Sequence, residues 1–267
     1  MPSDTCKAPA LAAGLELIEA LAAAPAPLGL SEAARLAGTN KNMAGRLLAV
    51  LCARGWAESV EPGPRYRLTL KPFAVAGAAA ARLSPLELAR GPLRDLWERT
   101  GESVYFGVPG QGTVLYLEHF DATGPVKVAG RAGGEYPLHC TAPGKAILAH
   151  LGPAAMAALI KNGLPRLTER TIITAAALRA ELERVRRHGY ATDHEEFGRG
   201  ILCVAAPVFD GAGRVVGAVG LSATTLNFTI KTLLAAHGAG VTACAGRISA
   251  KFGFSGAVPG PAEELCA

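Results

Sequence analysis

The stretch GYATDHEEFGRGILCVAAPVFDGAGRVVGAVGLS, residues 189–222, decides how the larger part of this chain folds. Two apolar runs flank a Gly-rich turn at Asp210–Gly213, which predicts two antiparallel strands joined as a hairpin. An acidic cluster precedes the first strand, Cys203 lies inside that strand, and Ser222 ends the second. The hairpin is therefore expected to bring Asp193, Cys203 and Ser222 to one pocket. Such a pocket fits a catalytic site, a metal site or a small-molecule sensor.

The composition is typical of a globular protein with two domains. With 267 residues, of which half are hydrophobic and 18% charged, the chain is long enough to bury substantial cores. No apolar run is long enough to cross a membrane, and residues 1–10 lack the features of a signal peptide. We therefore expect a cytoplasmic protein with no membrane partner. The six cysteines form no CxxC pair and are interpreted as free thiols rather than a disulfide framework.

Positive charge gathers between residues 40 and 71. Six basic residues stand there against two acidic ones, Glu58 and Glu61, a local excess of four positive charges. A phosphate-facing surface needs such an excess on one segment, although an ordinary solvated surface has the same signature. The six basic residues are Lys41, Arg46, Arg54, Arg65, Arg67 and Lys71.

The N-terminal segment predicts helices followed by a hairpin. Helical spacing of leucine and isoleucine over residues 11–21 indicates a first helix, and Ser31 is the expected N-cap of a short helix over 32–36. A third helix is expected over 40–54. One of its faces carries only small side chains apart from Asn42 and Arg46. Such a helix can lie deep in the DNA major groove as a recognition helix. The alternative interpretation is an ordinary Ala-rich helix of a helical bundle.

A basic hairpin follows this helix. Its strands are expected over 56–60 and 65–70, and its return strand places Arg65 and Arg67 on one side. Helices and hairpin together predict a winged helix-turn-helix DNA-binding domain over residues 1–72. A connecting helix is expected at 73–83.

Ser84-Pro85, an N-cap followed by proline at the first helical position, marks the start of a second domain over 84–252. Thr141 is the expected N-cap of a helix over 142–150, whose free N–H groups suit an anionic or polar ligand and whose Lys145 can add a cation. The pattern predicts an α+β fold in which helices pack on an antiparallel sheet. Strands are expected over 102–109, 113–120, 126–129, 201–209 and 214–221, helices over 85–99, 154–161, 174–187 and 226–251, and a disordered tail over 253–267.

Four stretches, in this order and spacing, resemble the IclR family of bacterial transcription regulators. They are LSEAARLAGTNKNMAGRLLAVLCARGW (30–56), TGESVYFGV (100–108), PLHCTAPGKAILA (137–149) and GRGILCVAAPVFDGAGRVVGAVGLS (198–222). The resemblance covers residues 11–252 and implies a GAF-like effector domain, dimers or tetramers, and control of nearby catabolic or transport genes. By motif, the family's recognition-helix positions fall on Asn40, Lys41, Asn42, Met43 and Arg46. Its effector-pocket positions fall on Thr141, Ala142, Asp193, Cys203, Gly220 and Ser222.

Two other functions have weaker support. Catalysis needs Cys203 as nucleophile with His194 as base, but an apolar strand disfavours a thiolate. A metal centre would gather His139, Cys140, Asp193, His194 and Cys203 without any compact ligand spacing. We therefore expect no catalytic residue, no metal ligand and no cofactor, and keep a metal-binding or thiol-based sensor as the alternative.

The predicted function is a DNA-binding regulator that senses a small organic metabolite and acts on double-stranded operator DNA as a homodimer or homotetramer. The expected metabolite is an organic acid, because the helix start at Thr141 offers N–H groups beside an apolar pocket. Asp193 would repel a carboxylate placed next to it. It is therefore expected to accept a hydrogen bond from a hydroxyl or amine at the other end of the ligand.

Overall fold

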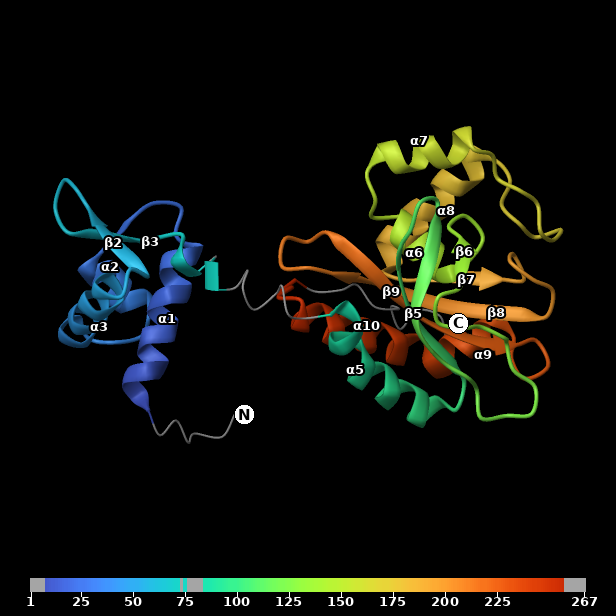
Figure 1. Ribbon diagram of the computed structural model, residues 1–267, viewed down its shortest axis with the longest axis horizontal. Coiled ribbons are helices and arrows are strands. Elements are labelled where there is room, and N and C mark those ends of the chain that lie inside the picture. The colour runs from blue at the N-terminus through green and yellow to red at the C-terminus, as the bar shows by residue number, and fades with distance from the viewer. Residues whose placement is uncertain (1–7, 73, 76–83, 257–267) are drawn as a thin grey trace. The chain divides into compact units, whose positions relative to one another are not determined.

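The computed structural model describes residues 8–72, 74–75 and 84–256 (Figure 1). The chain divides into two compact units, residues 1–83 and 84–267, and each has its own hydrophobic core. The connecting helix predicted at 73–83 and most of the predicted tail at 253–267 fall outside the described residues. At the start of that tail, the ring of Phe254 packs on Phe209, with 5.2 Å between the ring centroids.

The N-terminal unit is a winged helix-turn-helix. Its strands form a three-stranded antiparallel sheet in the order β1-β3-β2, and its core lies between the three helices and this sheet. The elements are α1 (Pro9–Ala23), β1 (Leu28–Gly29), α2 (Leu30–Leu36), α3 (Lys41–Ala53), β2 (Ala57–Val60) and β3 (Arg65–Leu68).

The third helix and the hairpin confirm the prediction within one or two residues, but the first two helices differ in detail. α2 begins at Leu30 with Gly29 as its N-cap, rather than at the predicted cap Ser31. The reason is the short strand β1, which pairs with β3 and holds Gly29 extended directly before the helix. In α1, Leu11 and Leu15 are 65% and 52% exposed, whereas Leu17 is fully buried.

A six-stranded antiparallel sheet forms the centre of the second unit, with strand order β6-β5-β4-β9-β8-β7. Its members are β4 (Ser103–Pro109), β5 (Thr113–Phe120), β6 (Glu135–Pro137), β7 (Ala191–His194), β8 (Ile201–Phe209) and β9 (Val215–Thr224). Helices cover both faces, so the predicted α+β class with a winged helix-turn-helix and an antiparallel-sheet domain is confirmed.

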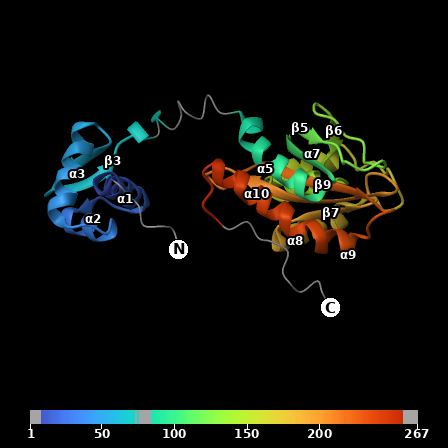
Figure 2. The same ribbon diagram turned by 90° about the horizontal axis from the view of Figure 1, so that it is seen from below.

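Alternate residues of the strands face the two helical layers. Val104 and Phe106 belong to the core beneath α5 (Pro85–Thr100) and α10 (Ala239–Lys251), whereas Tyr105 belongs to the core beneath α6 (Ala142–Leu148) and α8 (Ala175–His188). Figure 2 shows α5 beside α10, and an ion pair of 2.7 Å between Asp95 and Arg247 joins them. The remaining elements are α7 (Pro153–Lys161), α9 (Ile230–Leu233) and a π-helical turn (Leu234–Gly238).

Two predictions about this unit are wrong, and two of its strands were not predicted. Residues 126–129 are not a strand, because the edge of β5 is already paired with β6 and with the backbone of Gly133 and Gly134. Strands β6 and β7 were not predicted, since they have only three and four residues. The final helix begins at Ile230, where Thr229 caps it, rather than at 226.

Strand register places three of the predicted pocket residues in one row. Asp193 on β7 lies opposite Cys203 on β8, and Cys203 lies opposite Ser222 on β9. Because paired residues of antiparallel strands project from the same face of a sheet, all three point toward the layer of α6.

Candidate functional site

The exposed face of α3 carries the polar residues predicted to contact DNA. Lys41, Asn42 and Arg46 are exposed, and Met43 is half-buried. Asn40 is the N-cap of the helix, because its Oδ1 accepts a hydrogen bond of 2.8 Å from the backbone N–H of Met43. That bond takes the side-chain oxygen of Asn40 and leaves Lys41, Asn42 and Arg46 as the exposed polar side chains of this helix.

The two predicted wing arginines are tied to their own domain. Arg65 donates from Nε to the carbonyl of Pro27 at 2.8 Å, and Arg67 pairs with Glu58 at 2.7 Å. Exposed ion pairs contribute little, so a phosphate can compete for either arginine. In the described part of the chain, Lys41 and Arg46 have no acidic partner, and they are the cations that α3 offers without such competition.

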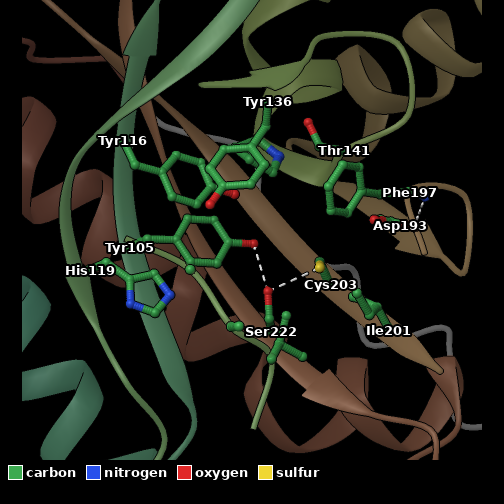
Figure 3. A pocket seen from close by; sticks show the side chains of 14 residues that line it. Tyr105, Tyr116, His119, Tyr136, Thr141, Asp193, Phe197, Ile201, Cys203 and Ser222 are labelled. Atoms are coloured by element: carbon green, nitrogen blue, oxygen red, sulfur yellow. Dashed lines mark hydrogen bonds between the residues drawn. The ribbon is translucent and has the colours of Figure 1, made fainter. Parts of the chain in front are cut away.

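The pocket of the second unit lies on the sheet face beneath α6 (Figure 3). Thr141, Asp193, Cys203 and Ser222, four of the six predicted effector residues, line it. The cavity volume is about 30 Å³, room for one or two water molecules. An organic ligand therefore enters only when side chains of the wall move. The other lining residues are Tyr105, Tyr116, His119, Val128, Ala129, Gly130, Tyr136, Pro143, Phe197 and Ile201.

The other two predicted effector residues do not line the cavity. Ala142 is buried in the first turn of α6. Gly220 lies directly under Tyr105, because a Cβ at this position would come within 1.9 Å of the Tyr105 ring. Gly220 therefore shapes the wall by allowing the ring to lie against β9.

An aromatic wall is the main feature that the sequence analysis missed. The rings of Tyr105 and Tyr116 stack with their centroids 4.4 Å apart, and Tyr136 packs on Tyr116 at the same separation. Phe197 meets Tyr136 edge-on at 5.7 Å. Alternation along the two strands could have identified Tyr105 and Tyr116, which face the same side of the sheet.

A row of hydrogen bonds crosses the floor of the pocket. Cys203 Sγ lies 3.0 Å from Ser222 Oγ, which in turn donates to the hydroxyl of Tyr105 at 3.0 Å (Figure 3). Burial, followed by the nearby Asp193 charge, raises the pKa of the Cys203 thiol far above its ordinary value. The thiol stays protonated, so it is neither a nucleophile nor a reactive redox group.

Asp193 lines the pocket, and one of its two carboxyl oxygens is buried without a partner. Its Oδ1 accepts hydrogen bonds from the backbone N–H groups of Glu196 at 2.7 Å and Phe197 at 3.3 Å. Its Oδ2 is buried and has no hydrogen-bond partner among the described residues. Burial, and then the charge of Glu196, raise the pKa of Asp193 to about 7.

The prediction that Lys145 could offer its charge to a ligand is wrong. The side chain is only 1% exposed, and its ammonium pairs with Glu196 and with Glu181, the latter at 3.3 Å. At the start of α6, Thr141 Oγ1 accepts the N–H of Gly144. The Lys145 ammonium and one N–H group of the helix start are thus used inside the protein.

We expect Asp193→Asn to raise the stability of the protein more at pH 8 than at pH 5. Asp193 titrates near pH 7 when folded and near 3.8 when unfolded, so the folded state holds the extra proton between these values. Stability is therefore lost as the pH rises toward 7, and asparagine escapes this loss while keeping an Oδ1 acceptor. The effect at pH 8 should exceed the effect at pH 5 by about 1–3 kcal/mol, measured by denaturant unfolding at both pH values.

Asp210→Asn is the matched control, and its expected effect on stability at pH 8 has the opposite sign. Burial of Asp210 is outweighed by its hydrogen bonds with Arg214 and Ala212, which lower the pKa of that carboxyl. Its contribution to stability is present at neutral pH and lost as the pH falls through the lowered pKa, so this variant should be destabilised at pH 8. A larger loss of stability for Asp193→Asn at pH 8 than at pH 5 would contradict the description of Asp193.

Neither a metal centre nor a membrane span is found in the parts that the structure describes. Within those ranges, no three His, Cys, Asp or Glu side chains are placed to hold a metal ion together. None of the helices over the same ranges has the length and apolar character needed to cross a bilayer. His139, one of the residues considered as a ligand, instead lies 3.0 Å from the carbonyl of Pro165 through its Nε2.

Comparison with known proteins matches both units. Residues 78–250 match the family model described as bacterial transcriptional regulator IclR C-terminal, and residues 10–61 match the IclR helix-turn-helix domain. BhcR of Paracoccus denitrificans, an HTH-type transcriptional regulator, is 33% identical over 221 residues, which are 82% of this chain and 79% of that protein. The glycerol operon regulatory protein of Streptomyces griseus is 34% identical over 209 residues, 77% of this chain and 81% of that protein.

A solved structure agrees with these sequence matches. The crystal structure of a putative IclR transcriptional regulator from a Silicibacter species is similar with a TM-score of 0.81 at 28% identity, covering 92% of this chain and 96% of that one. The proteins that match are transcriptional regulators, not enzymes.

Proposed function

This chain belongs to the IclR family of bacterial DNA-binding transcriptional regulators, and on that premise we propose that a small organic metabolite, bound beside Asp193, controls its binding to operator DNA. The observation that carries the proposal is the free Oδ2 of Asp193, buried in a pocket with aromatic walls. An unpaired buried polar atom costs stability, and a ligand that pairs with it removes that cost.

DNA recognition is assigned to the exposed face of α3. Asn42 has the donor and acceptor pattern that reads adenine, and Arg46 has the fork that reads guanine or binds phosphate. Lys41 and the wing arginines Arg65 and Arg67 contact phosphates in this proposal. Asn40 acts through its cap by fixing the start of the helix, and Met43 adds an apolar contact next to it.

Two copies of this domain are needed for specific regulation. A single module with a small basic surface binds non-specific DNA with dissociation constants of roughly 10⁻⁴–10⁻⁶ M, so we propose a homodimer or homotetramer that occupies paired half-sites. Catabolic or transport genes near its own gene are the proposed targets. The name of the relative from Streptomyces griseus, a glycerol operon regulatory protein, supports a catabolic role. The proposed site of action is the cytoplasm, where operator DNA is found.

The salt dependence of DNA binding tests this function. With about four phosphate contacts per copy, a dimer should show a slope of about −7 in a plot of log K against log salt concentration. Fluorescence anisotropy of a labelled duplex between 50 and 300 mM salt measures the slope. A slope near zero contradicts DNA binding through the surface described for α3 and the wing.

The pocket restricts where the carboxylate of the predicted organic acid can lie. Among the described residues, no lysine or arginine side chain lines the pocket. Lys145, the nearby cation at the start of α6, is paired with two glutamates. If the metabolite is an acid, its carboxylate lies away from Asp193. The alternative of a thiol-based sensor finds no support in Cys203, whose buried thiol stays protonated.

A further inference from the structure

A second hollow of the larger unit is a groove between the end of α6 and the helices α7 and α8. Its volume is about 230 Å³, near the lower limit of ordinary ligand sites and several times that of the pocket beneath α6. No residue that lines the groove also lines that pocket. The groove is therefore a separate place where a small organic molecule can fit without movement of the walls.

Most of the groove lining is apolar. Leu148 and Leu182 are only 1% and 2% exposed, and Leu151 and Met156 are half-buried beside them. Such a surface favours a ligand with a hydrocarbon body, because its burial removes apolar area from water. Met156 can adapt to the shape of that body, since its side chain is unbranched and flexible.

The charged residues that line the groove all belong to α8: Arg179, Glu183 and Arg186. Arg186 is held in place, because its Nε donates to the carbonyl of Ala149 at 2.5 Å, at the end of α6. Within the described ranges, neither Arg179 nor Arg186 has an acidic side chain within ion-pair distance, whereas Arg184 of the same helix pairs with Glu181. The terminal nitrogens of Arg186 are thus free to bind an acceptor from outside the chain.

The balance of these charges favours an anion. Two guanidinium groups stand against the single carboxylate of Glu183, which gives the lining a net charge of +1. A guanidinium can bind a carboxylate through two parallel hydrogen bonds. Because the Nε bond already fixes Arg186, little side-chain freedom is lost when a ligand binds. Arg179 adds a second positive charge seven residues, or about 10 Å, along α8.

We propose that this groove binds a small amphipathic carboxylate, an aliphatic acid of medium chain length. The carboxylate lies on the terminal nitrogens of Arg186, and the hydrocarbon chain lies against Leu148, Leu182 and Met156. This site goes beyond the proposed function, since its occupation depends neither on the effector pocket nor on DNA.

Methionine signals report directly on the groove. The chain has three methionines, Met1, Met43 and Met156, of which Met156 lines the groove and Met43 lies on α3. In the 267-residue protein with carbon-13-labelled methionine methyl groups, NMR titration with octanoate should shift the Met156 signal to saturation and leave the Met43 signal in place. The absence of a saturable Met156 shift at millimolar octanoate overturns the site.

Two further probes with the same hydrocarbon chain test the ligand class. Octanol and octylammonium should both bind at least about fivefold more weakly than octanoate, because neither offers Arg186 a carboxylate. Octanol that binds as tightly as octanoate would show that the groove selects only apolar chains, and tighter binding of octylammonium would show that its charge is misassigned. Either result overturns the proposal.

Arg186→Gln tests the contact itself. Octanoate binding should weaken about five- to tenfold through the loss of a charge-assisted pair of hydrogen bonds, while octanol binding changes little. Arg187→Gln, an equally exposed change on α8 outside the groove lining, should alter octanoate binding less than about twofold. Equal losses in the two variants would show that net charge alone attracts octanoate, and the assignment to Arg186 would be wrong.

Arg179→Gln keeps the test decisive if the loss of the Arg186 bond to Ala149 loosens the end of α6. It leaves that bond intact and should weaken octanoate binding about two- to threefold. Octanoate affinity that is unchanged in both arginine variants overturns the site. So does a Met156 signal that moves on dilution of the protein but not with octanoate, because a second copy of the chain would then cover the groove.

Discussion

Replacement of Lys145 by methionine is expected to lower the free energy of unfolding of the second unit by about 3–5 kcal/mol. The Lys145 ammonium is the cation that holds Glu196 and Glu181 in the protein interior, with the side chain 1% exposed. Methionine fills a similar volume but leaves the Glu196 carboxylate buried without its charge partner, whereas Glu181 keeps its ion pair with Arg184. Denaturant unfolding of the full chain, followed by circular dichroism, measures the loss.

Two further variants separate charge from packing. Lys161→Met, at an exposed position at the end of α7, should change stability by less than about 0.5 kcal/mol. Combining Lys145→Met with Glu196→Gln removes one orphaned charge and should recover part of the loss. A loss below 1 kcal/mol for Lys145→Met would show that the buried ion pair is not formed as described.

Arg46→Ala is expected to weaken operator binding at least 30-fold. Each guanidinium that contacts a base or phosphate contributes about 1–3 kcal/mol, and a dimer loses two of them. Arg46 projects from the exposed face of α3 and has no acidic partner among the described residues, so the whole contact is available to DNA. Fluorescence anisotropy on a selected duplex gives the change in dissociation constant.

Arg67→Ala and Arg199→Ala complete this test. Arg67 already pairs with Glu58, so its loss should cost DNA binding only about two- to fivefold. Arg199 belongs to the second unit, where it pairs with Glu169, and its replacement should have an effect below twofold. Equal effects of all three variants would indicate that net charge, rather than the α3 surface, governs binding.

Much of the second unit could be predicted because its signals are local. The runs over 201–209 and 214–221 are long, apolar and separated by a Gly-rich turn, and they form β8 and β9. Ser84-Pro85 starts α5 through a capping box, as the two residue types indicate. Short strands gave no such signal. β1 has two residues and β7 has four, too few to show a period, and each is recognisable only from its pairing with a neighbouring strand.

The pocket was predictable in its position but not in its chemistry. Adjacent strands indicated that Asp193, Cys203 and Ser222 come together, and the register places them in one row. The partners of Lys145 lie far along the chain, so nothing near it in the sequence showed that it would be buried and paired. The position of Gly220 beneath Tyr105 likewise depends on the β4–β9 register, which sequence patterns do not give.

Selection of DNA from a random pool by the 267-residue protein shows whether it reads DNA through α3. A regulator that reads DNA through α3 as a dimer should enrich one motif with two related half-sites, about one or more helical turns apart. Under the same conditions Arg46→Ala should fail to enrich that motif. Recovery of an unenriched pool by the wild-type protein, or of the same motif by both proteins, would contradict DNA recognition through α3.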